Sequence, residues 1–134
     1  MSEDVRPELQ GILAELRRLP DVLAAAIARR DGILIVHALP KSTNPKKIAA
    51  MAAAIVGTSE MAATEMGQGG FIQSIVDMRD GKILATGAGE EAILVTIVSA
   101  DANMGLVLLS VAKAVQSIEV LIDTGQRESP EVVS

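Results

Sequence analysis

The amino-acid sequence predicts an α+β domain in which helices cover both faces of a five-stranded antiparallel sheet. Apolar residues recur at helical spacing in three segments, at about residues 5–19, 45–66 and 103–123. Between these segments lie five short runs rich in β-branched or small apolar residues. Short turns join most of these runs, so neighbouring strands are expected to pair antiparallel. The predicted order of elements is α-β-β-α-β-β-β-α.

Length and composition limit the classes of protein that this chain can form. A chain of 134 residues has room for one compact domain. We expect that domain at residues 1–123, followed by a flexible polar tail at 124–134 that holds Gly125 and Pro130. With 49% hydrophobic residues the chain is too apolar to be disordered. A net charge of -5 argues against binding a nucleic-acid backbone.

The residue types that are absent exclude further functions. The chain has no cysteine, which removes disulfides and thiolate ligands and fits a cytoplasmic protein. Phe71 is its one aromatic residue, which argues against base stacking and aromatic cages. The longest apolar run, residues 48–56, is about half of the roughly 20 residues needed to cross a bilayer. We therefore expect no membrane insertion.

Turn and cap signals separate the elements in the first half of the chain. Pro7 suits the first turn of the helix at 5–19, and Pro20 ends that helix. The runs at 22–30 and 33–39 flank Asp31-Gly32, a dipeptide typical of a hairpin turn. Ser42, Thr43 or Asn44 could then cap the helix at 45–66.

Glycines separate the elements of the second half. Gly67 to Gly70 end the central helix and permit a left-handed cap. Three meandering strands follow at 71–78, 82–87 and 92–99, joined at Arg79-Asp80-Gly81 and at the turn 87–91. The last helix is expected at about 103–123.

The central helix at 45–66 is unusual because small or apolar residues surround it. One face is expected to pack on the sheet and holds Ile48, Met51, Ala52, Ile55, Ser59, Ala62 and Met66. A helix that is apolar nearly all round is normally buried all round. A second copy of the chain is the simplest cover for the other face. The predicted dimer interface on this helix consists of Ala50, Ala53, Ala54, Gly57, Thr58 and Met61.

The sequence offers few groups for catalysis or metal binding. His37 is the single histidine and lacks a carboxylate at helical or strand spacing, so no zinc site is predicted. Asp31 and Asp80 each precede a glycine in a turn, which explains them without paired-carboxylate chemistry. We therefore predict no enzyme activity, no cofactor and no metal.

Structural roles explain the other polar residues. The hydroxyls at Ser74, Thr86, Thr96 and Ser99 are expected on half-exposed strand faces or edges. The glycine cluster at 67–70 lies between a helix and a strand, the reverse of the order that a phosphate-binding loop requires, and the cluster at 87–89 joins two strands. Three arginines lie beside hairpin turns, where one could act as an arginine finger on a GTPase, although solvation is the commoner role. They are Arg29, Arg30 and Arg79.

Residues 5–122 resemble the roadblock family, which includes dynein light chains and partners of small Ras-like GTPases. The resemblance rests on LRRLPDV, on AAAIARRDGILIVHAL, on KKIAAMAAAIVGTSEMAATEM and on the strands from FIQSIVDM to ADANMGLVL. It implies a profilin-like fold whose dimers join through the third strand, here about residues 71–78, and pack their second helices together. The interface therefore gains three residues, which are Phe71, Gln73 and Ile75.

The resemblance implies a function that the residues alone do not specify. Family members bind small GTPases as scaffolds, and some stimulate GTP hydrolysis by positioning the GTPase's own residues. The first interpretation is therefore a non-catalytic homodimer that binds and regulates a Ras-like small GTPase. The alternatives are a profilin-like or PAS-like small-ligand sensor and a purely structural adaptor. A ligand pocket needs convergent polar groups, and the apolar strands are expected to supply almost none.

Overall fold

A computed structural model describes residues 4–127 of the chain. The element order confirms the one predicted from the sequence. The elements are α1 (Arg6–Leu16), β1 (Val22–Arg29), β2 (Leu34–Ala38), α2 (Pro45–Met66), β3 (Gln73–Met78), β4 (Gly81–Ala88), β5 (Ala92–Ser99) and α3 (Met104–Arg127).

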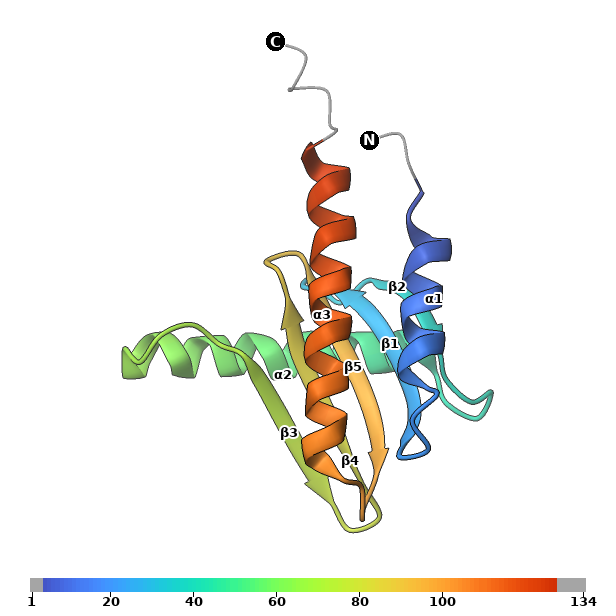
Figure 1. The fold of residues 1–134 in the computed structure, drawn as a ribbon. Helices are drawn as coiled ribbons and strands as arrows, with labels where there is room; N and C mark the ends of the chain where they lie inside the picture. Colours follow the sequence, from blue (N-terminus) through green and yellow to red (C-terminus); the bar gives the residue numbers. More distant parts are fainter. Residues whose placement is uncertain (1–3, 128–134) are drawn as a thin grey trace.

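The strands form one antiparallel sheet in the order β2-β1-β5-β4-β3. The central strand β5 pairs with both β1 and β4, whereas β2 and β3 lie at the edges. Figure 1 shows α1 and α3 side by side on one face of the sheet and α2 crossing the other face. The predicted α+β class with helices on both faces is confirmed.

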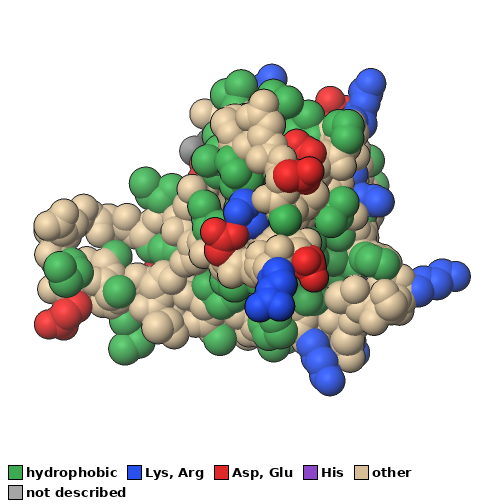
Figure 2. All heavy atoms as spheres, turned by 90° about the horizontal axis from the view of Figure 1, so that it is seen from below, with side chains coloured by type: hydrophobic (Ala, Val, Ile, Leu, Met, Phe, Trp, Pro, Cys, Tyr) green, Lys and Arg blue, Asp and Glu red, His purple; other side chains and the backbone are tan. Residues whose placement is uncertain are grey.

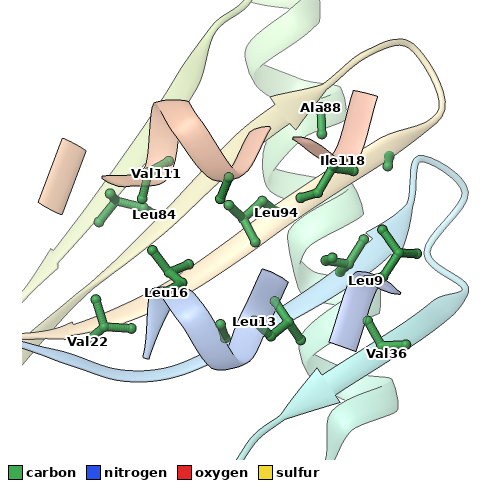
Figure 3. Close-up of a cluster of buried hydrophobic side chains, with 14 of the residues drawn as sticks. Leu9, Leu13, Leu16, Val22, Val36, Leu84, Ala88, Leu94, Val111 and Ile118 are labelled. Carbon is green, nitrogen blue, oxygen red and sulfur yellow. The ribbon is translucent and has the colours of Figure 1, made fainter. Parts of the chain in front are cut away.

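The larger core lies between the sheet and the pair α1 and α3. Leu9, Leu13 and Leu16 recur at helical spacing along α1 and are buried. They meet Leu94 of the central strand, and Val111 and Ile118 of α3 cover the same face (Figure 3). This packing fixes one face of the sheet and leaves the other to α2.

The smaller core lies beneath α2. Its buried members are small or β-branched, which lets the helix approach the sheet closely. They are Ala26, Ala52, Val56, Ala85, Ile93 and Val95.

Local chemistry fixes both ends of α2. Of the three predicted cap candidates, Asn44 is the cap, because its Oδ1 accepts hydrogen bonds from the backbone of Lys46 at 3.0 Å and of Lys47 at 3.3 Å. At the other end Gly67 has a φ of 65°, the left-handed conformation that the glycine cluster predicted.

Two helix ends differ from the predicted ones. α1 ends at Leu16 rather than near Leu19. After Leu16 the backbone forms tighter i→i+3 hydrogen bonds in place of the α-helical ones. Pro20 favours this ending because a proline disfavours helical conformation at the residue before it. α3 continues to Arg127, four residues beyond the expected end at Asp123. The remainder of the predicted tail, residues 128–134, lies outside the described residues.

The predicted sheet-facing side of α2 is partly wrong. Met51 and Met66 are exposed, as is Ala62, whereas Ala49 and Val56 are buried although neither was expected there. The smallest side chains mark the closest approach of the helix to the sheet, so the large Met51 lies at the margin. The end of the helix extends past the sheet, so its last residues have no strand beneath them.

The expected exposure of two threonines is also wrong. Thr96 is 0% exposed and Thr86 is 6% exposed. Both side chains point to the face of the sheet that α3 covers. Along their strands each lies two residues from a buried member of the larger core on that face, Leu94 for Thr96 and Ala88 for Thr86. Their hydroxyls have no hydrogen-bond partner among the described residues. Ser74 of the edge strand β3 and Ser99 at the end of the central strand β5 are half-buried, as predicted for half-exposed strand positions.

By length and composition alone, residues Met104–Ile122 of α3 could cross a membrane. In the structure this helix forms one wall of the larger core through Val107, Val111 and Ile118. Its apolar composition is therefore accounted for in part by packing within the domain.

Candidate functional site

The C-terminal part of α2 projects beyond the edge strand β3 (Figure 1). From Glu60 to Met66 every residue is exposed except Ala63, which is half-buried. The helix is complete to its cap at Gly67 although no strand lies beneath these last turns. Apart from Glu60 and Glu65 its side chains are uncharged, and such a projecting helix end is a surface that another chain can cover.

Large apolar side chains lie along the uncovered part of α2. Met51, Met61 and Met66 are 48%, 72% and 68% exposed. Methionine is flexible and polarizable and is over-used at adaptable binding surfaces. In Figure 2 the projecting arm at the left carries mainly hydrophobic and uncharged atoms, with acidic atoms near its end, while most charged side chains lie on the body of the molecule.

Beside this helix, β3 presents an open strand edge. The strand pairs with β4 on one side and lies at the end of the sheet on the other. Ile75, Val76 and Met78 along it are exposed. An unpaired strand edge with apolar side chains is a template for pairing with another chain. We call the exposed face of α2 together with β3 the helix–edge surface.

A hydroxyl pair fixes the helix against this strand. The Ser59 hydroxyl of α2 donates to the carbonyl of Ile55 at 2.8 Å, which uses its single hydrogen. Ser74 of β3 must therefore donate in the 2.6 Å contact between the two hydroxyls. The sequence placed Ser59 toward the sheet and Ser74 on a strand, but nothing in it indicated that they meet.

Of the nine predicted interface residues six lie on α2 and two, Gln73 and Ile75, on β3, whereas Phe71 lies in the segment that joins these elements. Five are exposed, which are Ala50, Ala54, Thr58, Met61 and Ile75. Four are half-buried, which are Ala53, Gly57, Phe71 and Gln73. Ala53 packs against the smaller core, and its Cβ lies beside Gly32, so its own chain already uses part of it. Pairing through these residues stays a prediction.

Arg30 has a structural role that the sequence did not indicate. Its Nε donates to the carbonyl of Ala92 at 3.0 Å and its Nη2 to that of Gly89 at 2.7 Å. A third contact joins its Nη1 to Glu60 of α2. The side chain is 23% exposed, so solvation, the expected role for such an arginine, is wrong for this one. Arg30 ties the β1–β2 turn to the β4–β5 turn and to α2.

The remaining candidate catalytic groups are dispersed. His37 is exposed, and its Nδ1 accepts a hydrogen bond from the backbone of Leu39 at 3.3 Å. Asp31 pairs with Arg29 at 2.5 Å in the first turn, whereas Asp80 lies in a different turn. Among residues 4–127 no three His, Cys, Asp or Glu side chains group as metal ligands would.

One pKa shift lies far from the helix–edge surface. The pKa of Asp4 is lowered, chiefly because its carboxylate accepts a side-chain hydrogen bond from Arg6 and secondarily a backbone one. The pair lies at the start of α1 and is solvent-exposed, so it is not part of the helix–edge surface.

The fold and the helix–edge surface together define a small α+β module of profilin-like shape, in which one helix and one strand edge are left uncovered. The chain belongs to the Roadblock/LC7 domain family, whose model matches residues 8–98. The resemblance inferred from the sequence is therefore confirmed.

Relatives and solved structures agree with this assignment. MJ1340 of Methanocaldococcus jannaschii is 32% identical over 113 residues, which cover 84% of this chain and 98% of that protein. Myxococcus xanthus MglB has the same fold with a TM-score of 0.85 at 19% identity, covering 92% of this chain and 94% of that one.

Two further solved structures extend the comparison of folds. A structure described as MglB with tetrameric arrangement has a TM-score of 0.82 at 19% identity, covering 92% of this chain and 94% of that one. Profilin II of Acanthamoeba castellanii has a TM-score of 0.58 at 14% identity, covering 88% and 98%. The expected profilin-like fold is thereby confirmed.

Proposed function

We propose that the chain is a non-catalytic homodimeric scaffold that binds and regulates a Ras-like small GTPase. The single observation that supports this most is the helix–edge surface, where an apolar helix projects beside an open strand edge. Membership of the Roadblock/LC7 family supports the GTPase as partner, because roadblock proteins are expected to bind such GTPases.

Pairing is proposed to use both parts of the surface. Two β3 edges align antiparallel, which supplies partners for backbone groups at the end of each sheet. The two α2 helices then pack together, and the small residues Ala50, Ala54 and Gly57 allow close approach of their backbones. Symmetric two-fold dimers are the commonest oligomers, and a standard interface buries about 800 Å² per partner.

One solved structure with the same fold supports the possibility of self-association. The printed description of that MglB structure refers to a tetrameric arrangement, so this fold is compatible with self-association. At 19% identity the likeness extends to the fold alone.

Pairing is tested by the mass in solution. Light scattering after size exclusion at micromolar concentration is expected to give twice the 13.9 kDa of the chain. Ala54→Glu buries a carboxylate at the helix contact and should weaken pairing at least about 100-fold. Ala14→Glu makes the same change on an exposed position of α1 and should leave the mass unchanged. A wild-type monomer with Ala54→Glu indistinguishable from it would end the pairing proposal.

GTPase binding is tested separately by calorimetry. The probe is a Ras-like GTPase encoded in the same genome, loaded in turn with GTP and with GDP. We expect one nucleotide state to bind with a Kd tighter than about 100 μM. If neither state reaches that affinity while the chain remains dimeric, GTPase regulation is wrong and a structural adaptor role becomes the better hypothesis.

Stimulated hydrolysis is expected to depend on the GTPase's own residues. Arg30 is already held by two backbone carbonyls and Glu60, so it is poorly placed to leave its site as an arginine finger. Arg29→Ala and Arg79→Ala should each leave single-turnover GTP hydrolysis within about threefold of wild type. A loss of about 10³ or more in either variant would instead identify a finger supplied by this chain.

A further inference from the structure

A cavity of about 390 Å³ lies where β3 begins and β4 ends, with α3 as one wall. Small-molecule sites have volumes from about 300 Å³ upward and are lined mainly by apolar side chains with a few polar groups. Here the apolar wall includes Leu108 and Val115 of α3. Polar side chains reach the cavity from four different elements or turns, which the sequence did not predict. They are Arg30, Gln73, Thr86 and Glu119.

The Thr86 hydroxyl is the unexplained group of this cavity. Thr86 lines it and is 6% exposed, yet its Oγ1 has no hydrogen-bond partner among residues 4–127. A buried hydroxyl without a partner destabilises a fold, and such groups in native proteins need a specific reason. Thr96 is equally unpartnered but does not line the cavity, so it provides a matched comparison.

The two charged groups at the cavity differ in how far they are neutralised. The guanidinium of Arg30 is held by Glu60 and by the carbonyls of Gly89 and Ala92. Glu119 accepts a hydrogen bond at Oε2 from the backbone of Gly89 at 3.0 Å. Within the part of the chain whose side chains are described, no ion pair includes Glu119. The unmatched charge at this cavity is therefore negative.

We propose that this cavity binds a small aliphatic amine. The ammonium group is recognised by the Glu119 carboxylate, with Thr86 and Gln73 as additional oxygen acceptors. The alkyl body lies against Leu108 and Val115. The site is independent of GTPase binding, although Gln73 belongs both to it and to the predicted dimer interface.

The proposal is tested by titrating the full chain, followed by amide chemical shifts in NMR. Isobutylamine hydrochloride is the probe, with isobutanol and isobutyrate as neutral and anionic molecules of the same shape, all at matched ionic strength. Saturable shifts at Gln73, Thr86 and Glu119 are expected for the amine with a Kd on the order of 1 mM. The alcohol and the acid should bind at least about tenfold more weakly.

Matched variants separate recognition from folding. Glu119→Gln keeps an acceptor for Gly89 but loses the charge, and should weaken amine binding at least about tenfold. Thr86→Val should weaken it about threefold to tenfold, whereas Thr96→Val should leave the Kd unchanged. The mass of each sample is checked by light scattering, so that a change in pairing is not mistaken for a change in ligand binding.

Three results would overturn the proposal. The first is the absence of saturable shifts at these residues up to about 20 mM amine, well above the expected Kd. The second is equal binding of amine, alcohol and acid, which would indicate nonspecific filling of an apolar hollow. The third is an unchanged Kd in Glu119→Gln.

Discussion

Replacing Arg30 by methionine should cost the fold about 2 to 4 kcal/mol. Methionine retains part of the apolar stem but leaves the carbonyls of Gly89 and Ala92 without the donors that now lie at 2.7 and 3.0 Å. A hydrogen bond to a charged group contributes about 1.5–3 kcal/mol. Because this turn is partly exposed, we take the two bonds together, rather than each of them, to contribute an amount within that range. Glu60 is 47% exposed, so its ion pair adds at most about 1 kcal/mol.

Urea unfolding followed by circular dichroism measures this loss, at one fixed protein concentration because a self-associating chain has concentration-dependent stability. A fall of roughly 10 °C in Tm should accompany it. Arg29→Met is the matched control, since Arg29 is exposed and its side chain pairs, among the described residues, only with the nearby Asp31. Unfolding free energies of the two variants within about 0.5 kcal/mol of each other would show that the Arg30 contacts do not stabilise the fold.

A double-mutant cycle between Arg30 and Gly87 tests the position of the Arg30 guanidinium. A Cβ at Gly87 would lie 2.8 Å from Nη2 of Arg30, closer than side chains pack. Because that guanidinium is held in place, Gly87→Ala should destabilise the wild type by about 1–2 kcal/mol. In the Arg30→Met background the clash is removed and most of the cost should disappear. Equal costs in both backgrounds would contradict the placement of the guanidinium.

Three other substitutions test the core, the helix cap and the buried hydroxyls. Leu13→Ala should cost about 2–5 kcal/mol in urea unfolding, because Leu13 is 0% exposed, while Leu109→Ala at 61% exposure should cost less than about 1 kcal/mol. Asn44→Ala should cost about 1 kcal/mol by removing the cap of α2, and Ser42→Ala, in the same loop, should change little. Thr96→Val should raise the unfolding free energy by about 1 kcal/mol, because it removes an unpartnered hydroxyl; a loss instead would mean that the hydroxyl has a partner in solution.

The order of elements could be predicted because each boundary depends on local chemistry. Asn44 and Pro45 begin α2, and Gly67 ends it, through interactions within a few residues of the chain. Gly32, with a φ of 91°, forms the predicted turn between β1 and β2. Such signals are present in the sequence whatever the remainder of the fold does, so the α+β class followed from them.

The side of α2 that faces the sheet could be predicted only in part. It depends on how closely the helix packs on the sheet, and the spacing of apolar residues along the helix does not show this. A stripe of apolar residues indicates which side of a helix is buried only when the other side is polar. Along α2, alanines occur on every side, so the helical spacing placed the large Met51 toward the sheet and left out Ala49. Close packing on the sheet selects the smaller side chain. The Arg30 and Ser59–Ser74 contacts join residues distant in sequence, so no local pattern could indicate them.

Exposed apolar residues alone do not identify the pairing surface, because α3 also exposes Leu106, Leu109 and Val120. What distinguishes α2 is its projection past the sheet beside an open strand edge, whereas α3 lies over the strands and α1. This difference predicts an asymmetry between two equivalent charge insertions. Leu109→Glu should leave the dimer mass unchanged in light scattering, whereas Ala54→Glu should produce monomers. If Leu109→Glu separates the subunits and Ala54→Glu does not, the pairing surface lies on α3, and the proposed pairing through the helix–edge surface must be abandoned.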